Sequence, residues 1–313
     1  MTISKIDKNK VFPVGYCKKT TAGNTVEFLS MSSAPMPPPT LKLDSDHYCN
    51  TNTGEVLEYL KSATRADNTD SLRKTFKRIR DLINANCTEP EKLHWITLTY
   101  AENMTDTTRL YNDFSKFWKR FKRFCAAAGH NAPEYITIIE PQARGAWHCH
   151  CLFVWDKERP FVENKALADM WEQGFVKIKS VTDCDNLGAY LSAYLGDIPL
   201  ENGENPKGEI KEVNGKRYLK GGRLHLYPVG VNIVRTSRKI KKPLQELVPP
   251  EAVDADKVMS GLMTFKTSYK LQSDETSRFL SKEYYNTKRP ITQAQALLQH
   301  AVGLGIVIKE VNA

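Results

Sequence analysis

The stretch Tyr135-Ile-Thr-Ile-Ile-Glu-Pro-Gln-Ala-Arg-Gly-Ala-Trp-His-Cys-His-Cys-Leu-Phe-Val-Trp155 predicts the β-hairpin around which the chain is organised. Two runs rich in β-branched and aromatic residues flank residues 141–146, where a proline and a glycine mark a turn. A hairpin joins antiparallel strands, so this stretch already favours an antiparallel sheet over a parallel one.

The hairpin brings metal-binding side chains together. Residues two apart in a strand share a face, so His148 and His150 point to the same side. If the strands pair about Arg144 or Gly145, Glu140 joins that face. Two imidazoles and one carboxylate, with coordination positions left open, suit a divalent ion that also touches substrate. We therefore interpret the hairpin as a metal site rather than as a strand that merely carries two histidines.

The cysteines do not extend this site. Strand alternation turns Cys149 and Cys151 away from the histidines, which argues against a zinc site that uses all four residues. The chain has seven cysteines, an odd number, and none forms a Cys-x-x-Cys pair. This pattern argues against a disulfide scaffold and favours a reducing compartment.

Charge and composition narrow the function classes. The 313 residues include 45 Lys and Arg against 36 Asp and Glu, a formal charge of +9 that favours a polyanionic partner. The N-terminal residues lack the apolar core of a signal peptide, and no run of 18 apolar residues occurs. We expect a cytoplasmic protein with no membrane partner.

The segments around the hairpin predict an α+β fold. Apolar spacing of three and four predicts helices, and β-branched alternation predicts strands. The expected order is helix 70–83, strand 93–100, helix 106–127, the hairpin, helix 164–173 and strand 175–181. Gly174 is the predicted stop of the helix that precedes it. This order predicts an antiparallel sheet with helices mainly on one face.

The outer parts of the chain carry less information. Before the sheet we expect a strand over 24–31, a polyproline linker over 32–39 and a hairpin over 46–60. After it, residues 262–271 alternate like a strand, and residues 292–302 have helical spacing.

A second chemical element is the predicted helix from Asp185 to Gly196. Tyr190 and Tyr194 stand four residues apart and therefore share a helix face. Alone, they also fit an ordinary apolar stripe. Together with a metal site and a basic chain, they favour phosphoryl transfer to tyrosine, in which a phenolate attacks a DNA phosphate and keeps the bond energy in a 5′-phosphotyrosine.

Three motifs resemble those of rolling-circle replication initiators of the HUH endonuclease superfamily, the phage and plasmid type. They are Thr97-Leu-Thr99, Glu140-Pro-Gln-Ala-Arg-Gly-Ala-Trp-His-Cys-His150 and Tyr190-Leu-Ser-Ala-Tyr194, in the family's order. The resemblance covers residues 95–196 and implies an RRM/ferredoxin-like core, with extensions at both ends.

The resemblance also implies roles for residues. His148 and His150 would be metal ligands with Glu140 as the third, the ion Mg²⁺ or Mn²⁺, and Tyr190 the first nucleophile. Cys149 replaces a usual bulky aliphatic residue, and Ala193 stands where relatives often carry a lysine. The second departure puts in doubt two equivalent tyrosines.

We divide the chain by function into an N-terminal extension (1–46), a nicking and joining domain (47–198) and a basic C-terminal region (199–313). The last region contains five cations within eight residues, which we expect to contact origin DNA: Arg235, Arg238, Lys239, Lys241 and Lys242.

The sequence therefore predicts a site-specific, metal-dependent nickase and strand transferase that starts rolling-circle replication on single-stranded or supercoiled origin DNA. No Gly-x-x-x-x-Gly-Lys-[Ser/Thr] motif occurs, so we expect a host helicase and host replication proteins as partners. A relaxase or single-strand transposase shares the catalytic parts. A different class, a DNA-binding repressor with a structural metal, would bind DNA without cleaving it.

Overall fold

The computed structural model describes most of the chain: residues 2–35, 37–60, 68–142, 144–181, 187–188, 198–199, 210–213, 216–219, 221, 223–273 and 276–288. The chain forms two compact units, which are considered separately. One consists of Met1–Lys61 together with Pro243–Ala313, and the other of Ser62–Lys242. The division at residues 46 and 198 concerns function and stays a prediction.

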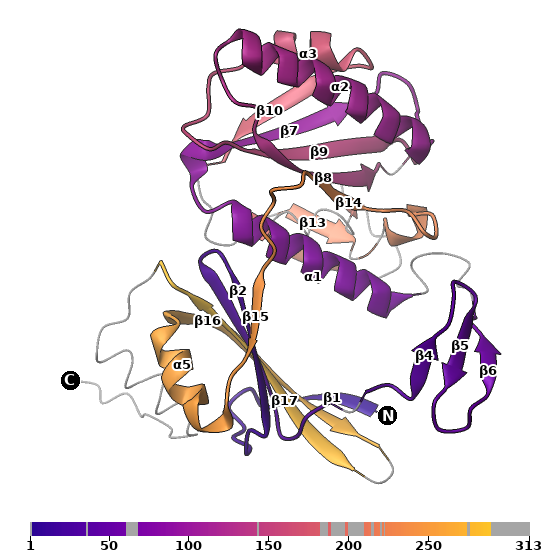
Figure 1. Cartoon of the computed structure of the whole chain (residues 1–313), viewed down its shortest axis with the longest axis vertical. Coiled ribbons are helices and arrows are strands. Elements are labelled where there is room, and N and C mark those ends of the chain that lie inside the picture. Colours follow the sequence, from indigo (N-terminus) through magenta and orange to yellow (C-terminus); the bar gives the residue numbers. More distant parts are fainter. Residues whose placement is uncertain are drawn as a thin grey trace. The chain divides into compact units, whose positions relative to one another are not determined.

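The second unit is built on a five-stranded sheet in the order β10-β7-β9-β8-β14, in which every pair of neighbours is antiparallel (Figure 1). Its strands are β10 (Val176–Ser180), β7 (Leu93–Thr99), β9 (Trp147–Val154), β8 (Glu134–Pro141) and β14 (Val234–Thr236). The predicted α+β fold class is confirmed, and the predicted hairpin forms the middle of the sheet as β8 and β9.

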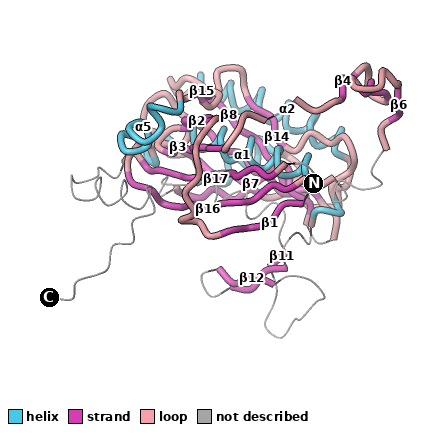
Figure 2. The backbone as a smooth tube through the Cα atoms, turned by 90° about the horizontal axis from the view of Figure 1, so that it is seen from below, coloured by secondary structure: helices cyan, strands magenta, loops and turns pink. Residues whose placement is uncertain are grey.

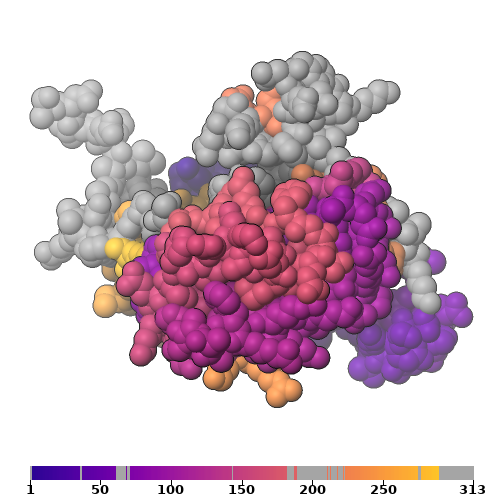
Figure 3. Space-filling view, turned by 90° about the horizontal axis from the view of Figure 1, so that it is seen from above, coloured from indigo at the N-terminus to yellow at the C-terminus, as the bar shows by residue number. Residues whose placement is uncertain are grey.

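Helices α2 (Thr107–Ala127) and α3 (Asn164–Trp171) pack on the aromatic face of this sheet. The side chain of Asp106 caps α2 by accepting a hydrogen bond from the Thr108 amide. Phe121 lies 4.9 Å from the ring of Phe153 on β9. The predicted aromatic stripe of α2 is thus a core, and Figure 3 shows the opposite, solvent side of α2 and α3 as one continuous surface.

Helix α1 (Thr69–Asn86) begins at Asn68, whose side chain accepts from the Ser71 amide. Its apolar side includes Ile79 and Ile83, both fully buried. In Figure 1 the strands of the sheet lie between α2 above and α1 below.

The predicted end of α3 needs a correction. The helix stops at Trp171, and Glu172, not Gly174, takes the left-handed conformation with φ of 61°. Gly174 has another role, because a Cβ there would lie 2.4 Å from the carbonyl oxygen of Thr99. Glycine at this position lets the chain pass close to the end of β7.

Shorter elements complete the second unit. A 3₁₀ turn, η2 (Pro90–Lys92), precedes β7, and η3 (Leu224–Leu226) precedes β14. A small antiparallel sheet has the order β11-β13-β12, formed by β11 (Ile198–Pro199), β13 (Lys216–Leu219) and β12 (Ile210–Val213).

The first unit joins the two ends of the chain in one six-stranded sheet. Figure 2 shows its strands in the order β15, β2, β3, β17, β16, β1 from top to bottom. Their bounds are β15 (Leu244–Leu247), β2 (Tyr16–Ala22), β3 (Thr25–Met31), β17 (Ser277–Asn286), β16 (Leu262–Gln272) and β1 (Thr2–Ile6). The predicted strands at 24–31 and 262–271 are confirmed, but their common sheet was not foreseen.

The rest of the first unit is small. The hairpin predicted over 46–60 is confirmed as β5 (His47–Asn50) and β6 (Val56–Glu58), with β4 (Thr40–Lys42) as a third strand. A 3₁₀ turn, η4 (Pro250–Ala252), leads into α5 (Val253–Met259). The helix predicted over 292–302 lies outside the described residues. None of the helices in the described ranges has the length and apolarity needed to cross a membrane.

Candidate metal centre

The register of the hairpin decides which side chains meet. Glu140 pairs with His148 and Ile138 with His150, so the strands pair about Arg144. This is one of the two registers that were predicted to bring the carboxylate onto the histidine face. The neighbouring strand β7 continues the same face, since its Thr97 pairs with His150.

The three predicted ligands converge. One ligand atom each from Glu140, His148 and His150 lies within 4.8 Å of the other two. Two ligands of one ion, each about 2.1 Å from it, are separated by at most about 4 Å, so a small side-chain movement is enough to close the set. The cluster can therefore hold a divalent ion.

A fourth oxygen supports this fit. Oε1 of Gln142 is buried and has no hydrogen-bond partner among the described residues, while the same amide group contacts Nε2 of His148. Amide and carboxylate oxygens suit Mg²⁺ and Mn²⁺, and imidazole suits transition metals. Sequence reasoning missed Gln142, although its position two residues after Glu140 was a usable signal.

His150 is oriented from both sides. Its Nε2 contacts Oε2 of Glu140, and its Nδ1 lies 3.2 Å from the hydroxyl of Thr97. A metal-binding histidine commonly uses one ring nitrogen for the ion and donates a hydrogen bond from the other. Thr97, from the first predicted motif, therefore holds the ring so that Nε2 faces the carboxylate.

Both histidines are neutral at pH 7. Burial lowers the pKa of His148 to about 4, with further lowering by His150 and Arg144. Burial likewise lowers the pKa of His150 to about 4, assisted by the charge of Lys179. A neutral imidazole keeps a lone pair for a metal, so the site can accept an ion without losing protons first.

The cysteines lie apart from the ligands, as strand alternation predicted. Cys149 and Cys151 are buried, and their sulfur atoms are 3.8 Å apart. Both pack in the core on the face that α2 covers. No disulfide joins the six cysteines that the structure describes.

A cation stands beside the ligands. The guanidinium of Arg223 forms an ion pair with Oε1 of Glu140, and only 12% of its side chain is exposed. Sequence reasoning passed over Arg223, because it lies 73 residues after the second histidine and belongs to no recognised motif.

The predicted nucleophiles, Tyr190 and Tyr194, lie outside the described residues. Leu187 and Gly188, shortly before them in the sequence, are described as helical and buried. The amide of Gly188 donates to Oδ1 of Asn84 on α1.

The five predicted DNA contacts are exposed: Arg235, Arg238, Lys239, Lys241 and Lys242. The guanidinium of Arg235 stacks 3.2 Å from the ring centroid of Tyr111. The backbone of Lys241 exchanges two hydrogen bonds with the side chain of Asn86, which fixes this basic segment to the end of α1.

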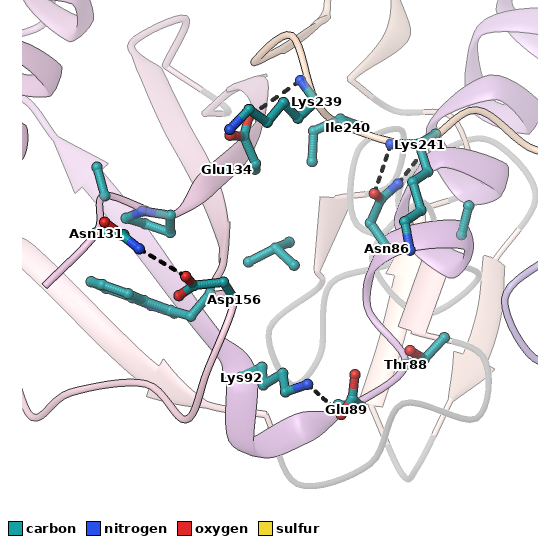
Figure 4. A pocket seen from close by; sticks show the side chains of 15 residues that line it. Asn86, Thr88, Glu89, Lys92, Asn131, Glu134, Asp156, Lys239, Ile240 and Lys241 are labelled. Atoms are coloured by element: carbon teal, nitrogen blue, oxygen red, sulfur yellow. Dashed lines mark hydrogen bonds and ion pairs between the residues drawn. The ribbon is translucent and has the colours of Figure 1, made fainter.

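Lys239 and Lys241 also line a pocket of about 630 Å³ (Figure 4). Glu134 lies on its wall, at the opposite end of β8 from the metal ligand Glu140. Six residues of strand separate the two glutamates, or about 20 Å. The exposed cations and the candidate metal centre are thus within reach of one short single strand of DNA.

Comparison with protein families agrees with the motifs. Residues 93–198 match the family of the replication-associated protein ORF2. The matched range is about a third of the chain and includes β7, α2, the hairpin with all three ligands, α3 and β10. No curated protein shows significant similarity to the chain. The family match confirms the predicted resemblance to replication initiators and associates the chain with DNA replication.

Proposed function

We propose that this protein is a metal-dependent, site-specific endonuclease and strand transferase that nicks one strand of origin DNA to start rolling-circle replication. The observation that carries the proposal is the cluster of Glu140, His148 and His150 on one sheet face, inside the range that matches the replication-associated family. A structural ion favours a closed shell of four protein ligands, whereas this set leaves positions for a phosphate.

The reaction is a transesterification. The phenolate of Tyr190 attacks the scissile phosphorus, the bond to the 3′ oxygen breaks, and the 3′-hydroxyl leaves with a proton. The 5′ end stays on the tyrosine as a phosphodiester until a 3′-hydroxyl attacks it and restores the DNA bond. A bound Mg²⁺ or Mn²⁺ would supply a Lewis acid for the phosphate oxygen. Tyr194 would serve as the second nucleophile.

The chain's own residues prepare this step. Thr97 orients His150, and burial keeps both imidazoles neutral. The basic segment with Arg238 and Lys239 would hold the backbone of single-stranded or supercoiled origin DNA. A host helicase would unwind ahead of the 3′ end. The cysteines without disulfides are in keeping with the cytoplasm of a bacterial host.

The direct test uses a single-stranded oligonucleotide with the origin sequence of the encoding replicon, incubated with the protein and Mn²⁺. We expect a covalent protein–DNA adduct that survives denaturation, disappears with EDTA and is absent from the Tyr190→Phe variant. If Tyr194→Phe keeps the adduct, Tyr190 is the first nucleophile. No adduct with any origin fragment would overturn the proposal.

A second measurement separates the enzyme from a DNA-binding repressor with a structural metal. EDTA should leave the melting temperature of the enzyme within a few degrees of that of the metal-loaded protein. Loss of the folded state on metal removal, together with salt-sensitive DNA binding without cleavage, would favour the repressor.

A further inference from the structure

Arg223 is the closest described cation to the candidate metal centre, to judge by its ion pair with Glu140. It lies 25 residues beyond the range that matches the replication-associated family. Burial lowers the pKa of its guanidinium, yet arginine stays charged at any physiological pH. A buried positive charge at this place requires a role, because its desolvation is costly unless it is paired.

The segment that carries Arg223 is attached to the hairpin. Four residues later, Tyr227 is 1% exposed, and its hydroxyl donates to the carbonyl of Ile139, the neighbour of Glu140. The ring of Tyr227 also packs 5.9 Å from that of Trp147. Gly221, with φ of 69°, starts the turn that leads to Arg223. The guanidinium is therefore held at the site by the fold.

The two oxygens of Glu140 divide their partners. Oε1 takes Arg223, whereas Oε2 faces Nε2 of His150. An ion between Oε2 and the imidazoles leaves the arginine on the other oxygen. The guanidinium and the ion can thus stand side by side, on either side of one carboxylate.

The charges of the site call for an anion. Glu140 contributes one negative charge, which Arg223 already offsets, and both histidines are neutral. Lys179 and Arg144 are near enough to lower the pKa values of the histidines. A divalent ion would bring a surplus of two positive charges. A phosphodiester, and still more its transition state, supplies the missing negative charge.

We propose that Arg223 binds a non-bridging oxygen of the scissile phosphate beside the ion and stabilises the charge that develops there during tyrosine attack. The inference rests on the proposed function. Guanidinium suits this task because its planar fork of donors matches phosphate oxygens. The bond changes are those of the transesterification above, and Arg223 neither gains nor loses a proton.

The test compares Arg223→Ala and Arg223→Lys with the wild-type protein and with Arg123→Ala, which removes an exposed arginine from α2. Adduct formation is measured in single turnover at saturating oligonucleotide and Mn²⁺. We expect the rate to fall about 100-fold in Arg223→Ala and less in Arg223→Lys, and to stay unchanged in Arg123→Ala. The Mn²⁺ affinity should change by less than about 3-fold.

A substrate change identifies the atom. An oligonucleotide with a methylphosphonate at the scissile position lacks one charged non-bridging oxygen. If Arg223 acts on that oxygen, this substrate slows the wild-type protein, and Arg223→Ala adds little further loss. Circular dichroism melting shows that each variant is folded, and Arg223→Lys serves if Arg223→Ala is not.

Three outcomes overturn the inference. Adduct formation by Arg223→Ala within about 3-fold of wild type excludes a role in the reaction. A parallel loss of Mn²⁺ affinity that excess metal repairs shows that Arg223 only positions Glu140. Equal losses on the normal and the methylphosphonate substrates place the guanidinium elsewhere. Absence of an adduct in the wild-type protein defeats the proposed function itself and this inference with it.

Discussion

The amide of Gly188 donates a buried hydrogen bond of 2.9 Å to Oδ1 of Asn84. A Cβ at residue 188 would lie 2.4 Å from the carbonyl oxygen of Arg80 and 2.7 Å from Oδ1 of Asn84. Glycine is therefore required for residues 187 and 188 to approach α1 this closely. In the sequence, Tyr190 follows two residues later, so this contact fixes the chain just before the proposed nucleophile.

We predict that Gly188→Ala forces the two segments apart and lowers the free energy of unfolding by about 1–3 kcal/mol, the usual range for overpacking. Adduct formation should slow as well. Urea denaturation and adduct assays measure the two effects. Asn84→Ala serves as a comparison, because it removes the acceptor without a clash and should cost about 1 kcal/mol. Wild-type stability in Gly188→Ala would contradict the close contact.

Thr97 should control metal affinity without touching the metal. Thr97→Val keeps the shape of the side chain but removes the hydroxyl beside Nδ1 of His150. We expect Mn²⁺ to bind about 10–100-fold more weakly, as when the outer partner of a metal-bound histidine is removed. Isothermal titration measures the affinity.

The matched control for Thr97→Val is Thr137→Val. Thr137 is a buried threonine on β8 of the same sheet, paired with Cys151 and therefore on the other face. Its substitution should leave Mn²⁺ binding unchanged. Equal affinities for the two variants would show that the Thr97 hydroxyl does not orient His150.

His94 makes the stability of the second unit depend on pH. Burial, with help from Arg159, lowers its pKa to about 4, and the indole of Trp155 donates to its Nδ1. Between about pH 6.5 and pH 4, the unfolded chain binds a proton at His94 that the folded chain does not. The stabilisation by the neutral ring is thus complete above about pH 6.5 and declines as the pH falls.

The variant His94→Gln keeps an acceptor for Trp155 but does not titrate. Its unfolding free energy should fall less between pH 7 and pH 4 than that of the wild-type protein, by up to roughly 3 kcal/mol. Urea titrations at pH 7, 5.5 and 4 give the two curves. Parallel curves would show that His94 is charged in the folded protein.

The basic segment should determine the salt dependence of DNA binding. For single strands, each lost phosphate contact reduces the slope of log affinity against log salt by about 0.7. We expect this reduction and weaker oligonucleotide binding when the five cations are replaced by glutamine: Arg235, Arg238, Lys239, Lys241 and Lys242. Fluorescence anisotropy at salt concentrations from roughly 50 to 300 mM measures both effects.

A control of similar charge comes from α2, where Lys116, Lys119 and Lys122 are exposed. Replacing these three lysines by glutamine lowers the net charge but should leave the slope per charge smaller than in the basic-segment variant. If both variants lose affinity in proportion to charge alone, general electrostatic attraction explains binding and the segment has no special contact.

The sequence by itself determined the parts of the fold that depend on local pattern. Strand alternation and the turn residues predicted the hairpin and placed Glu140 with His148 and His150, because side chains in a strand alternate with a fixed period of two. Helical spacing predicted α1 and α2 for a similar reason. The end of α3 was predicted wrongly, since Glu172 took the conformation expected of a glycine.

Only the tertiary structure decided which distant segments meet. Arg223 reaches Glu140 because Tyr227 fixes its turn to β8, and β3 joins β17 across more than two hundred residues. No local pattern encodes such pairs, because they depend on how packed elements exclude water and satisfy buried charge together. The sequence thus named the three ligands of the candidate metal centre, and the fold added the arginine beside them.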